Sequence, residues 1–264
     1  MASGRTPPSR KRTAQRLDAY VRAIALVREK VKAFDSYPFN IPAIHALETL
    51  ELHPKVTFFI GENGSGKSTL AEAIAVAAGF NAEGGSKNFN FASRRSESEL
   101  HQSIRLVRGV RRPKTGYFLR AESYFNVATE IERLDREPGG PPIIASYGGK
   151  SLHEQSHGES FLALVQHRFS GNGFYVLDEP EAALSPQRQL SFLVSMHELI
   201  KANSQFVIAT HSPILLAYPD ATIYILGPDG MAKVAYEQTE HYSLTRDFLV
   251  NRERYLRRLF GQET

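Results

Sequence analysis

One nine-residue segment constrains the fold of this chain more than any other. Gly61–Thr69 reads GENGSGKST and fits the pattern G-x-x-x-x-G-K-[ST]. The β-branched and aromatic run Lys55–Ile60 precedes it, and Ser68–Ala78, rich in Ala, follows it and ends before Gly79. The sequence therefore predicts a buried strand, a glycine loop and a helix in direct succession.

The residue types in this loop suit a phosphate group. Glycines let successive backbone N–H groups curl around an anion, and the following helix points its partly positive N-terminus at it. Lys67 adds a positive charge for the β- and γ-phosphates, and the Ser68 hydroxyl can ligate Mg²⁺. The pattern indicates a nucleoside triphosphate, without indicating what is done with it. The candidate nucleotide-binding residues are Gly61, Asn63, Gly64, Ser65, Gly66, Lys67, Ser68 and Thr69.

A second apolar run ends in two carboxylates. Phe174–Leu177 precedes Asp178 and Glu179, and we expect this strand to lie beside the phosphate-loop strand. Asp178 could then hold the hydration shell of Mg²⁺, and Glu179 could face the γ-phosphate and orient or deprotonate water. The alternative is a strand that ends in two solvated acids, and the phosphate loop in the same chain makes it the weaker interpretation.

Strand-like and helix-like segments alternate over residues 55–80 and 158–226. This alternation predicts an α/β fold with a mostly parallel central sheet. We expect the C-terminal stretch, Thr245–Phe260, to form one helix packed on the core. The other expected strands cover residues 19–27, 47–52, 117–120, 206–209 and 222–226, and the other expected helices cover 123–136, 158–169 and 186–202, with a short one near 214.

Composition excludes several classes of protein. The chain of 264 residues has no Cys, which excludes disulfides, thiolate zinc sites and a cysteine nucleophile. It has no apolar run of about 18 residues, so we expect no direct membrane insertion and a cytoplasmic location. The net charge of the chain is +4, but residues 1–16 hold five basic residues and no acid, which leaves −1 for the other 248 residues. We expect a disordered basic tail before a near-neutral body.

Within the body, residues 94–120 are strongly basic. They hold eight Lys and Arg against Glu97 and Glu99. The plainer interpretation is a solvated face whose arginines pair with Glu97, Glu99 or Glu130. The alternative is a surface that follows the phosphates of DNA or RNA.

Three further motifs extend the pattern. Gln155–Ser160 (QSHGES), Glu179–Ser185 (EPEAALS) and Thr210–Ser212 (THS) occur in this order. With the phosphate loop, they resemble the signature motif, the end of Walker B with the D-loop, and the H-loop of the ATP-binding-cassette (ABC) ATPase superfamily. The resemblance covers about residues 45–226 and is strongest to small stand-alone bacterial AAA/ABC-like ATPases related to SMC and RecF heads. It implies a P-loop NTPase fold over residues 17–264, an ABC-type head with an inserted helical lobe at about 85–157.

The resemblance also implies a mechanism, Mg²⁺-dependent hydrolysis of ATP by two copies that pair head to tail and trap two ATP molecules. Lys67, Glu179 and His211 would be catalytic in one copy, with His211 bonded to the γ-phosphate. The other copy would contribute Ser156, Gly158 and Glu159 of the signature to the nucleotide. The metal ligands would be Ser68, Asp178 and, at the position of the usual Q-loop glutamine, Glu122, with Gln102 as the second choice.

Some positions depart from the family pattern. His157 and Glu159 stand where glycine and glutamine are usual in the signature, and Ser185 stands where the D-loop usually has aspartate. No aromatic side chain is clearly placed to stack on adenine; Phe34, Tyr37 and Phe39 are candidates that could equally be packing residues.

The function expected from the sequence is therefore that of an ATP-sandwiched homodimer that drives an unidentified conformational output, with an unknown protein partner. One alternative is a nucleotide-gated clamp on DNA or RNA. Another, less favoured because no clear Q-loop is present, is the nucleotide-binding subunit of an ABC transporter.

Overall fold

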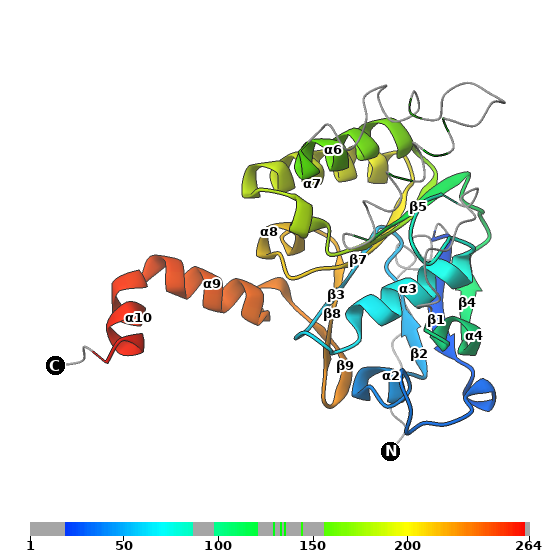
Figure 1. Cartoon of the computed structure of the whole chain (residues 1–264), viewed down its shortest axis with the longest axis horizontal. Helices are drawn as coiled ribbons and strands as arrows, with labels where there is room; N and C mark the ends of the chain where they lie inside the picture. The colour runs from blue at the N-terminus through cyan, green and yellow to red at the C-terminus, as the bar shows by residue number, and fades with distance from the viewer. Residues whose placement is uncertain are drawn as a thin grey trace, which may run out of the picture.

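A six-stranded sheet lies at the centre of the computed structural model (Figure 1). Its first five strands are parallel, and the last returns antiparallel to its neighbour. The predicted α/β fold with a mostly parallel sheet is thus confirmed. In spatial order the strands are β5 (Thr115–Arg120), β6 (Gly173–Asp178), β7 (Gln205–Ala209), β3 (Val56–Ile60), β8 (Thr222–Gly227) and β9 (Gly230–Val234).

The structure describes residues 19–86, 98–120, 129, 133, 135, 144 and 156–261. The basic tail at 1–16, Glu122 and most of the expected helical lobe lie outside the described residues. The described part of that lobe, 98–120, contributes the strands β4 (Ile104–Arg108) and β5 to the two sheets of the body.

The prediction that the strand before Asp178 lies beside the phosphate-loop strand is wrong. β6, which ends at Asp178, does not lie beside β3, because β7 pairs with both of them. The motifs alone could not show this, since a strand later in the chain can be inserted between two earlier ones. The consequence is favourable for the site, because the segment after β7, which begins with Thr210 and His211, emerges between the phosphate loop and the carboxylates.

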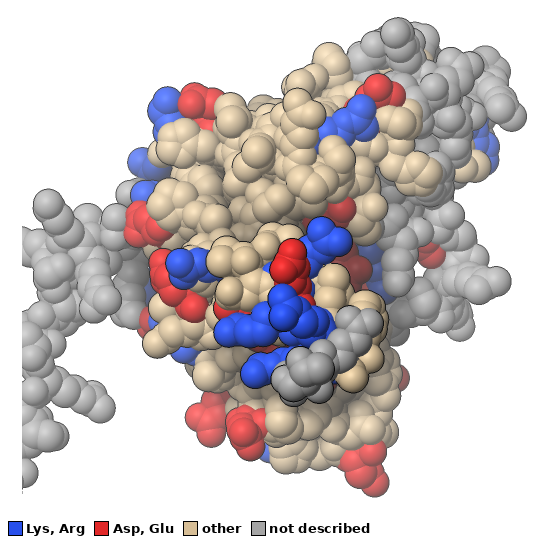
Figure 2. Space-filling model, turned by 90° about the vertical axis from the view of Figure 1, so that its left-hand side faces the viewer, with Lys and Arg blue, Asp and Glu red and all other residues tan. Residues whose placement is uncertain are grey.

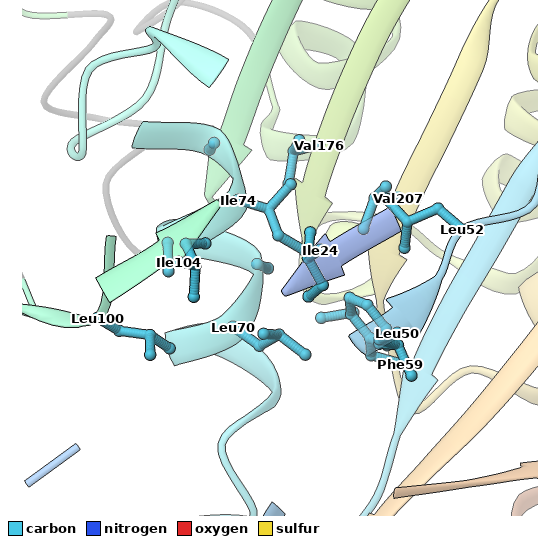
Figure 3. Packing of buried hydrophobic residues seen from close by; sticks show 14 of the residues in the cluster. Ile24, Leu50, Leu52, Phe59, Leu70, Ile74, Leu100, Ile104, Val176 and Val207 are labelled. Atoms are coloured by element: carbon cyan, nitrogen blue, oxygen red, sulfur yellow. The ribbon is translucent and has the colours of Figure 1, made fainter. Parts of the chain in front are cut away.

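A smaller antiparallel sheet packs against the first through a helix. Its strands are β2 (Thr49–Glu51), β1 (Val21–Leu26) and β4, in that order. Helix α3 (Lys67–Ala78) contacts β4 of this sheet as well as β6 and β7 of the central one. Figure 3 shows Leu70 and Ile74 of α3 among apolar side chains from both sheets, all of them in one buried cluster. The helix that begins at the phosphate loop is therefore fixed by burial on two sides.

Three helices cover the other face of the central sheet. They are α6 (His157–Arg168), α7 (Pro186–Lys201) and α8 (Pro213–Leu216), and their apolar side chains form a second buried cluster with that face. The remaining short elements are η1 (Arg28–Lys30), α2 (Pro42–His45), α4 (Leu100–Ser103), η3 (Pro180–Ala183) and η4 (Tyr236–Gln238).

The C-terminal stretch does not form one helix packed on the core, contrary to the prediction. It forms α9 (Glu240–Val250) and α10 (Arg252–Leu259), which break at Asn251 and extend as an arm away from the body (Figure 1). Neither helix has a buried residue, and Leu249 is 70% exposed. Figure 2 faces the end of this arm and shows basic side chains gathered there, where α10 carries Arg252, Arg254, Arg257 and Arg258. Among the described helices, none is long and apolar enough to cross a membrane.

Candidate functional site

The phosphate loop leaves β3 and enters α3 through backbone shapes that require glycine. Gly61, Gly64 and Gly66 have φ angles of 147°, 82° and 97°. A Cβ atom on Gly61 would lie 2.3 Å from the carbonyl oxygen of Leu226. The loop is thus shaped by the absence of side chains, which leaves its N–H groups and the first turn of α3 open to an anion.

Lys67, the first residue of α3, is held inside the loop. Its side chain is buried, and Nζ donates hydrogen bonds to the carbonyl oxygens of Gly61 and Glu62, both at 2.9 Å. Burial lowers the pKa of Lys67, and the carboxylates of Glu179 and Asp178 act in the opposite direction. An ammonium group has three donors, so one remains for a ligand while two fix its position.

The two carboxylates at the end of β6 have different surroundings. Asp178 ends the strand and is 4% exposed. Glu179 takes a left-handed backbone conformation with φ of 51°, and its N–H donates to the carbonyl of Ala209 at 2.9 Å. This turn directs the Glu179 side chain into a cleft that Glu62, Asn63 and His211 also line. Asp178 is thus buried, whereas the Glu179 side chain is 40% exposed and lines the cleft.

His211 reaches the same cleft from the end of β7. Its Nε2 atom lies 3.8 Å from Oε1 of Glu179, and its backbone N–H donates to Oε1 of Glu181 at 2.5 Å. Burial lowers the pKa of His211, Lys67 lowers it further, and Glu179 raises it. The structure therefore places Lys67, Glu179 and His211, three candidates from the sequence, close to one another.

Glu181 is one site residue that we did not single out from the sequence. Burial raises its pKa, against the hydrogen bond from the His211 backbone. The sequence shows an acid here, three residues after Asp178 and next to Pro180. It does not show that this acid contacts His211, which is 30 positions later.

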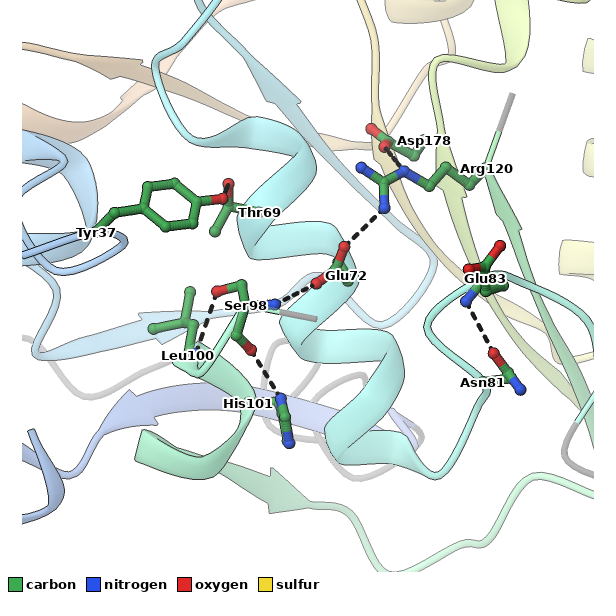
Figure 4. A network of polar contacts seen from close by, with 10 residues as sticks. All are labelled: Tyr37, Thr69, Glu72, Asn81, Glu83, Ser98, Leu100, His101, Arg120 and Asp178. Atoms are coloured by element: carbon green, nitrogen blue, oxygen red, sulfur yellow. Dashed lines mark hydrogen bonds and ion pairs between the residues drawn. The ribbon is translucent and has the colours of Figure 1, made fainter. Parts of the chain in front are cut away.

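A buried ion pair beside Asp178 is the second feature missed (Figure 4). Nη1 of Arg120, at the end of β5, lies 2.7 Å from Oε2 of Glu72 on α3, and Nε lies 3.7 Å from Oδ2 of Asp178. Glu72 also accepts a hydrogen bond from the backbone of Ser98 at 3.0 Å. The available signal was a single acid within Leu70–Ala78, where every other residue of α3 is apolar. Arg120 thus connects β5 with α3 and with β6, next to Asp178, the metal ligand proposed from the sequence.

The position of Arg120 also corrects the interpretation of the basic segment. Arg120 points inward to two acids and is not part of a surface for nucleic acid. Arg108 donates to the carbonyl of Ala77, and Glu99 lies 3.9 Å from Lys32, which is outside this segment. Arg94, Arg95, Glu97 and Glu130 lie outside the described residues.

The signature segment begins α6 and is held within its own chain. Ser156 and Glu159 form a capping box, in which Oε2 of Glu159 accepts from the Ser156 backbone N–H at 3.0 Å, and the same oxygen also accepts from the Ser156 hydroxyl at 2.7 Å. Arg188 of α7 donates to Oγ of Ser156 at 3.0 Å and to Oε1 of Glu159 at 3.2 Å. The hydrogen bond from Ser156 is the main cause of the lowered pKa of Glu159. Among the described residues, no hydrogen bond or ion pair links Ser156 to the phosphate loop.

Gly158 and Ser185 have clear structural roles beside this cluster. A Cβ atom on Gly158 would lie 2.4 Å from Nη1 of Arg188 and 2.9 Å from the carbonyl oxygen of Ala183. Ser185 caps the N-terminus of α7 by accepting from the backbone of Arg188 at 3.4 Å. A serine at this D-loop position therefore begins a helix, a role that serine performs as well as aspartate.

The three aromatic residues considered for adenine stacking, and Gln102, considered as a metal ligand, differ in how exposed their side chains are. Phe39 is buried and Phe34 packs edge-on against it, whereas Tyr37 is 65% exposed and its hydroxyl lies 3.3 Å from that of Thr69. Packing thus accounts for two of the three aromatic candidates. Gln102 is exposed on α4 and lines a groove with Lys30 and Arg105, not with the carboxylates.

Comparison with known proteins gives two family matches. A model described as an AAA domain matches residues 30–141, and a model described as "AAA domain, putative AbiEii toxin, Type IV TA system" matches residues 152–217. The first contains the phosphate loop and the second contains the signature segment, Asp178, Glu179 and His211. No curated protein matches the chain.

Several solved structures are similar in shape. The SMC head domain from Thermotoga maritima is 18% identical, with 81% of this chain and 98% of that chain covered and a TM-score of 0.43. cbiO1 from Clostridium perfringens, part of the ABC transporter complex cbiONQ, is 15% identical, with 88% of this chain and 95% of that chain covered and a TM-score of 0.47. An ATP-binding cassette of another ABC transporter is 19% identical, with 88% of this chain and 98% of that chain covered and a TM-score of 0.46. At this level of similarity they say nothing of this chain's activity or partners.

The two family matches and the site geometry agree. The matched segments are the ones that supply the loop, the carboxylates and the histidine, and the sheet order brings them to one edge. The chain therefore carries AAA-domain sequence on both sides of residues 142–151, and its resemblance to ABC/AAA-like P-loop proteins is confirmed.

Proposed function

We propose that this protein binds ATP with Mg²⁺ and hydrolyses it to ADP and phosphate. The observation that carries the proposal is the convergence at one sheet edge of Lys67 in a phosphate loop, the acid pair after β6, and His211 at 3.8 Å from Glu179. A cation, an accessible carboxylate and an imidazole around one cleft are the groups that phosphoryl transfer to water uses.

The residues present fit Mg²⁺. The ion prefers oxygen ligands and usually keeps several waters, with one or two protein ligands besides the phosphates. Ser68, in the first turn of α3, and Asp178, at the end of β6, supply a hydroxyl and a carboxylate of this kind. When bound, Mg²⁺ would neutralise charge on the β- and γ-phosphates. In the loop itself, Oγ of Ser65 is buried with no hydrogen-bond partner among the described residues, which suits a group that bonds to a phosphate oxygen.

The chain's own residues have separate tasks in this proposal. The loop N–H groups and Lys67 bind the phosphates and hold them in place. Glu179, the more exposed of the two acids, orients the attacking water and accepts its proton. His211 donates a hydrogen bond to the γ-phosphate and fixes its position against Glu179. Arg120 and Glu72 keep Asp178 in position from behind.

We further propose that a second copy completes each site. In one chain, Ser156 and Gly158 belong to the α6–α7 cluster, away from the phosphate loop, and Ser156 is occupied by Glu159 and Arg188. Pairing head to tail would bring this N-terminus of α6 onto the γ-phosphate of the other copy, where the Ser156 hydroxyl exchanges Glu159 for phosphate. ATP then joins the two copies and hydrolysis releases them.

The test compares the wild type with Lys67→Ala and Glu179→Gln by measuring phosphate release at millimolar ATP and Mg²⁺. We expect steady hydrolysis by the wild type, a loss of about 100-fold or more in Glu179→Gln, and no phosphate release by Lys67→Ala, which should not bind the nucleotide. Arg257→Met, an exposed substitution on α10, is the control and should match the wild type. Equal rates in the wild type and Glu179→Gln would overturn the proposal.

A further inference from the structure

A second histidine lies directly behind His211. Nδ1 of His211 is 3.2 Å from Nε2 of His241, and the ring centroids are 5.3 Å apart. His241 is the second residue of α9, so this contact joins the cleft to the first turn of the C-terminal arm. None of the sequence motifs includes it.

Both histidines are held at fixed backbone positions. The N–H of His211 is bonded to Glu181, as described above. Thr239, which is buried, caps α9 by accepting from the backbone of Tyr242, and the Tyr236 hydroxyl donates to the carbonyl of Pro213 at 2.9 Å. The approach of the two rings is thus determined by the fold on both sides.

The charge state of the pair follows from its surroundings. Burial lowers the pKa of His211 and of His241 and Lys67 lowers both further, whereas Glu179 raises that of His211 and Glu240 that of His241, so that the net shift favours the neutral form of each ring. Two neutral imidazoles share one hydrogen between Nδ1 of His211 and Nε2 of His241, so one ring must donate and the other accept.

The position of Glu179 decides the direction. If His211 donated through Nδ1, its Nε2 atom would carry a lone pair and face the Glu179 carboxylate, 3.8 Å away, with two acceptors opposed. If His241 donates through Nε2, His211 carries its hydrogen on Nε2 and presents it to the carboxylate. The second arrangement satisfies the hydrogen bond with His241 and turns the Nε2 hydrogen of His211 toward the carboxylate, and it is also the form that can donate to a phosphate oxygen.

We propose that His241 is a positioning residue, which donates from Nε2 to Nδ1 of His211 and so holds the hydrogen of His211 on Nε2, toward the cleft. The inference rests on the proposed function for its catalytic meaning, but the tautomer itself is a property of the nucleotide-free chain. The same contact makes the placement of α9 part of the geometry of the hydrolysis site.

Matched substitutions separate the hydrogen bond from the packing. His241→Gln places an amide N–H near the position of Nε2 and keeps the donor, whereas His241→Phe keeps a ring without a donor. We expect kcat to fall about 10- to 100-fold in His241→Phe with KM nearly unchanged, and to stay within about threefold of the wild type in His241→Gln. In a His211→Ala background, His241→Phe should have no further effect. His197→Phe, at an exposed histidine bonded to Tyr218, is the control.

A second readout does not depend on activity. In nucleotide-free protein labelled with ¹⁵N-histidine, NMR of the imidazole nitrogens should show His211 protonated on Nε2 in the wild type and in His241→Gln. In His241→Phe the signal should shift toward a mixture of both tautomers; His211→Gln identifies the resonances.

These results distinguish the inference from the proposed function. Protonation of His211 on Nδ1 in the wild type, or an unchanged tautomer in folded His241→Phe, overturns the role of His241. A wild type with the expected tautomer and no hydrolysis overturns the proposed function and leaves the contact established.

Discussion

Removing Arg120 should be costly because it strands a buried acid. Glu72 has a side-chain exposure of 6% and Arg120 of 22%, and they meet at 2.7 Å. Exposed ion pairs contribute at most about 1 kcal/mol, whereas removing one partner of a buried pair costs about 3–5 kcal/mol, since the other charge is left uncompensated. The partial exposure of Arg120 places Arg120→Met near the lower end, at about 3 kcal/mol of unfolding free energy, or about 6–12 °C in Tm.

The assay is urea unfolding of nucleotide-free protein, arranged as a double-mutant cycle. Glu72→Leu with Arg120→Met should cost clearly less than the two single changes added together, because no lone charge remains. Arg257→Met, which breaks a pair with exposures of 64% and 89%, is the matched control and should change stability by less than about 1 kcal/mol. A cost below about 1 kcal/mol for Arg120→Met, or strict additivity in the cycle, would refute the reasoning.

Three further predictions follow from single contacts. Glu179→Gln should form dimers in ATP and Mg²⁺ and remain monomeric in ADP, as measured by light scattering; monomers in both would count against the two-copy site. Gly158→Ala should displace Arg188, since its Cβ would also press on the Ala183 carbonyl at 2.9 Å, and we expect about 1–3 kcal/mol lower stability and loss of the ATP-dependent dimer, with unchanged stability as the contrary result. His53 has a lowered pKa, mainly through burial, so the folded state binds fewer protons than the unfolded one and stability falls as the pH drops below about 6.5. His53→Asn keeps an acceptor for the backbone N–H groups of Lys55 and Val56 and should lose part of this acid sensitivity in denaturation curves between about pH 5 and 7; an unchanged pH slope would contradict it.

The sequence predicted best where local chemistry decides the structure. The glycine loop, α3 ending at Gly79, and the buried runs before Asp178 and His211 all follow from short patterns of residues. These same patterns supplied the three residues that converge on the cleft. They require no knowledge of which strand lies beside which.

Features set by long-range contacts were not predictable in this way. The insertion of β7 between β3 and β6, the pairing of β4 with β1, and the contacts of Arg120 with Glu72 and of His211 with His241 join residues far apart in the chain. The position of the C-terminal helices α9 and α10 was also not predictable from local patterns. Apolar residues at partly helical spacing predicted burial, but the chain breaks at Asn251 and forms an arm on which Leu249 and Phe260 are exposed and no residue of either helix is buried.

The most direct test of the account is to identify the nucleotide that the protein retains. Each protein is incubated with Mg²⁺ and ATP labelled in the adenine ring, separated quickly from free nucleotide, and quenched. We expect mainly ADP on the wild type, intact ATP on Glu179→Gln, and no bound nucleotide on Lys67→Ala. The proposed function would be contradicted if the wild type held no nucleotide, or if Glu179→Gln converted its ATP to ADP as quickly as the wild type.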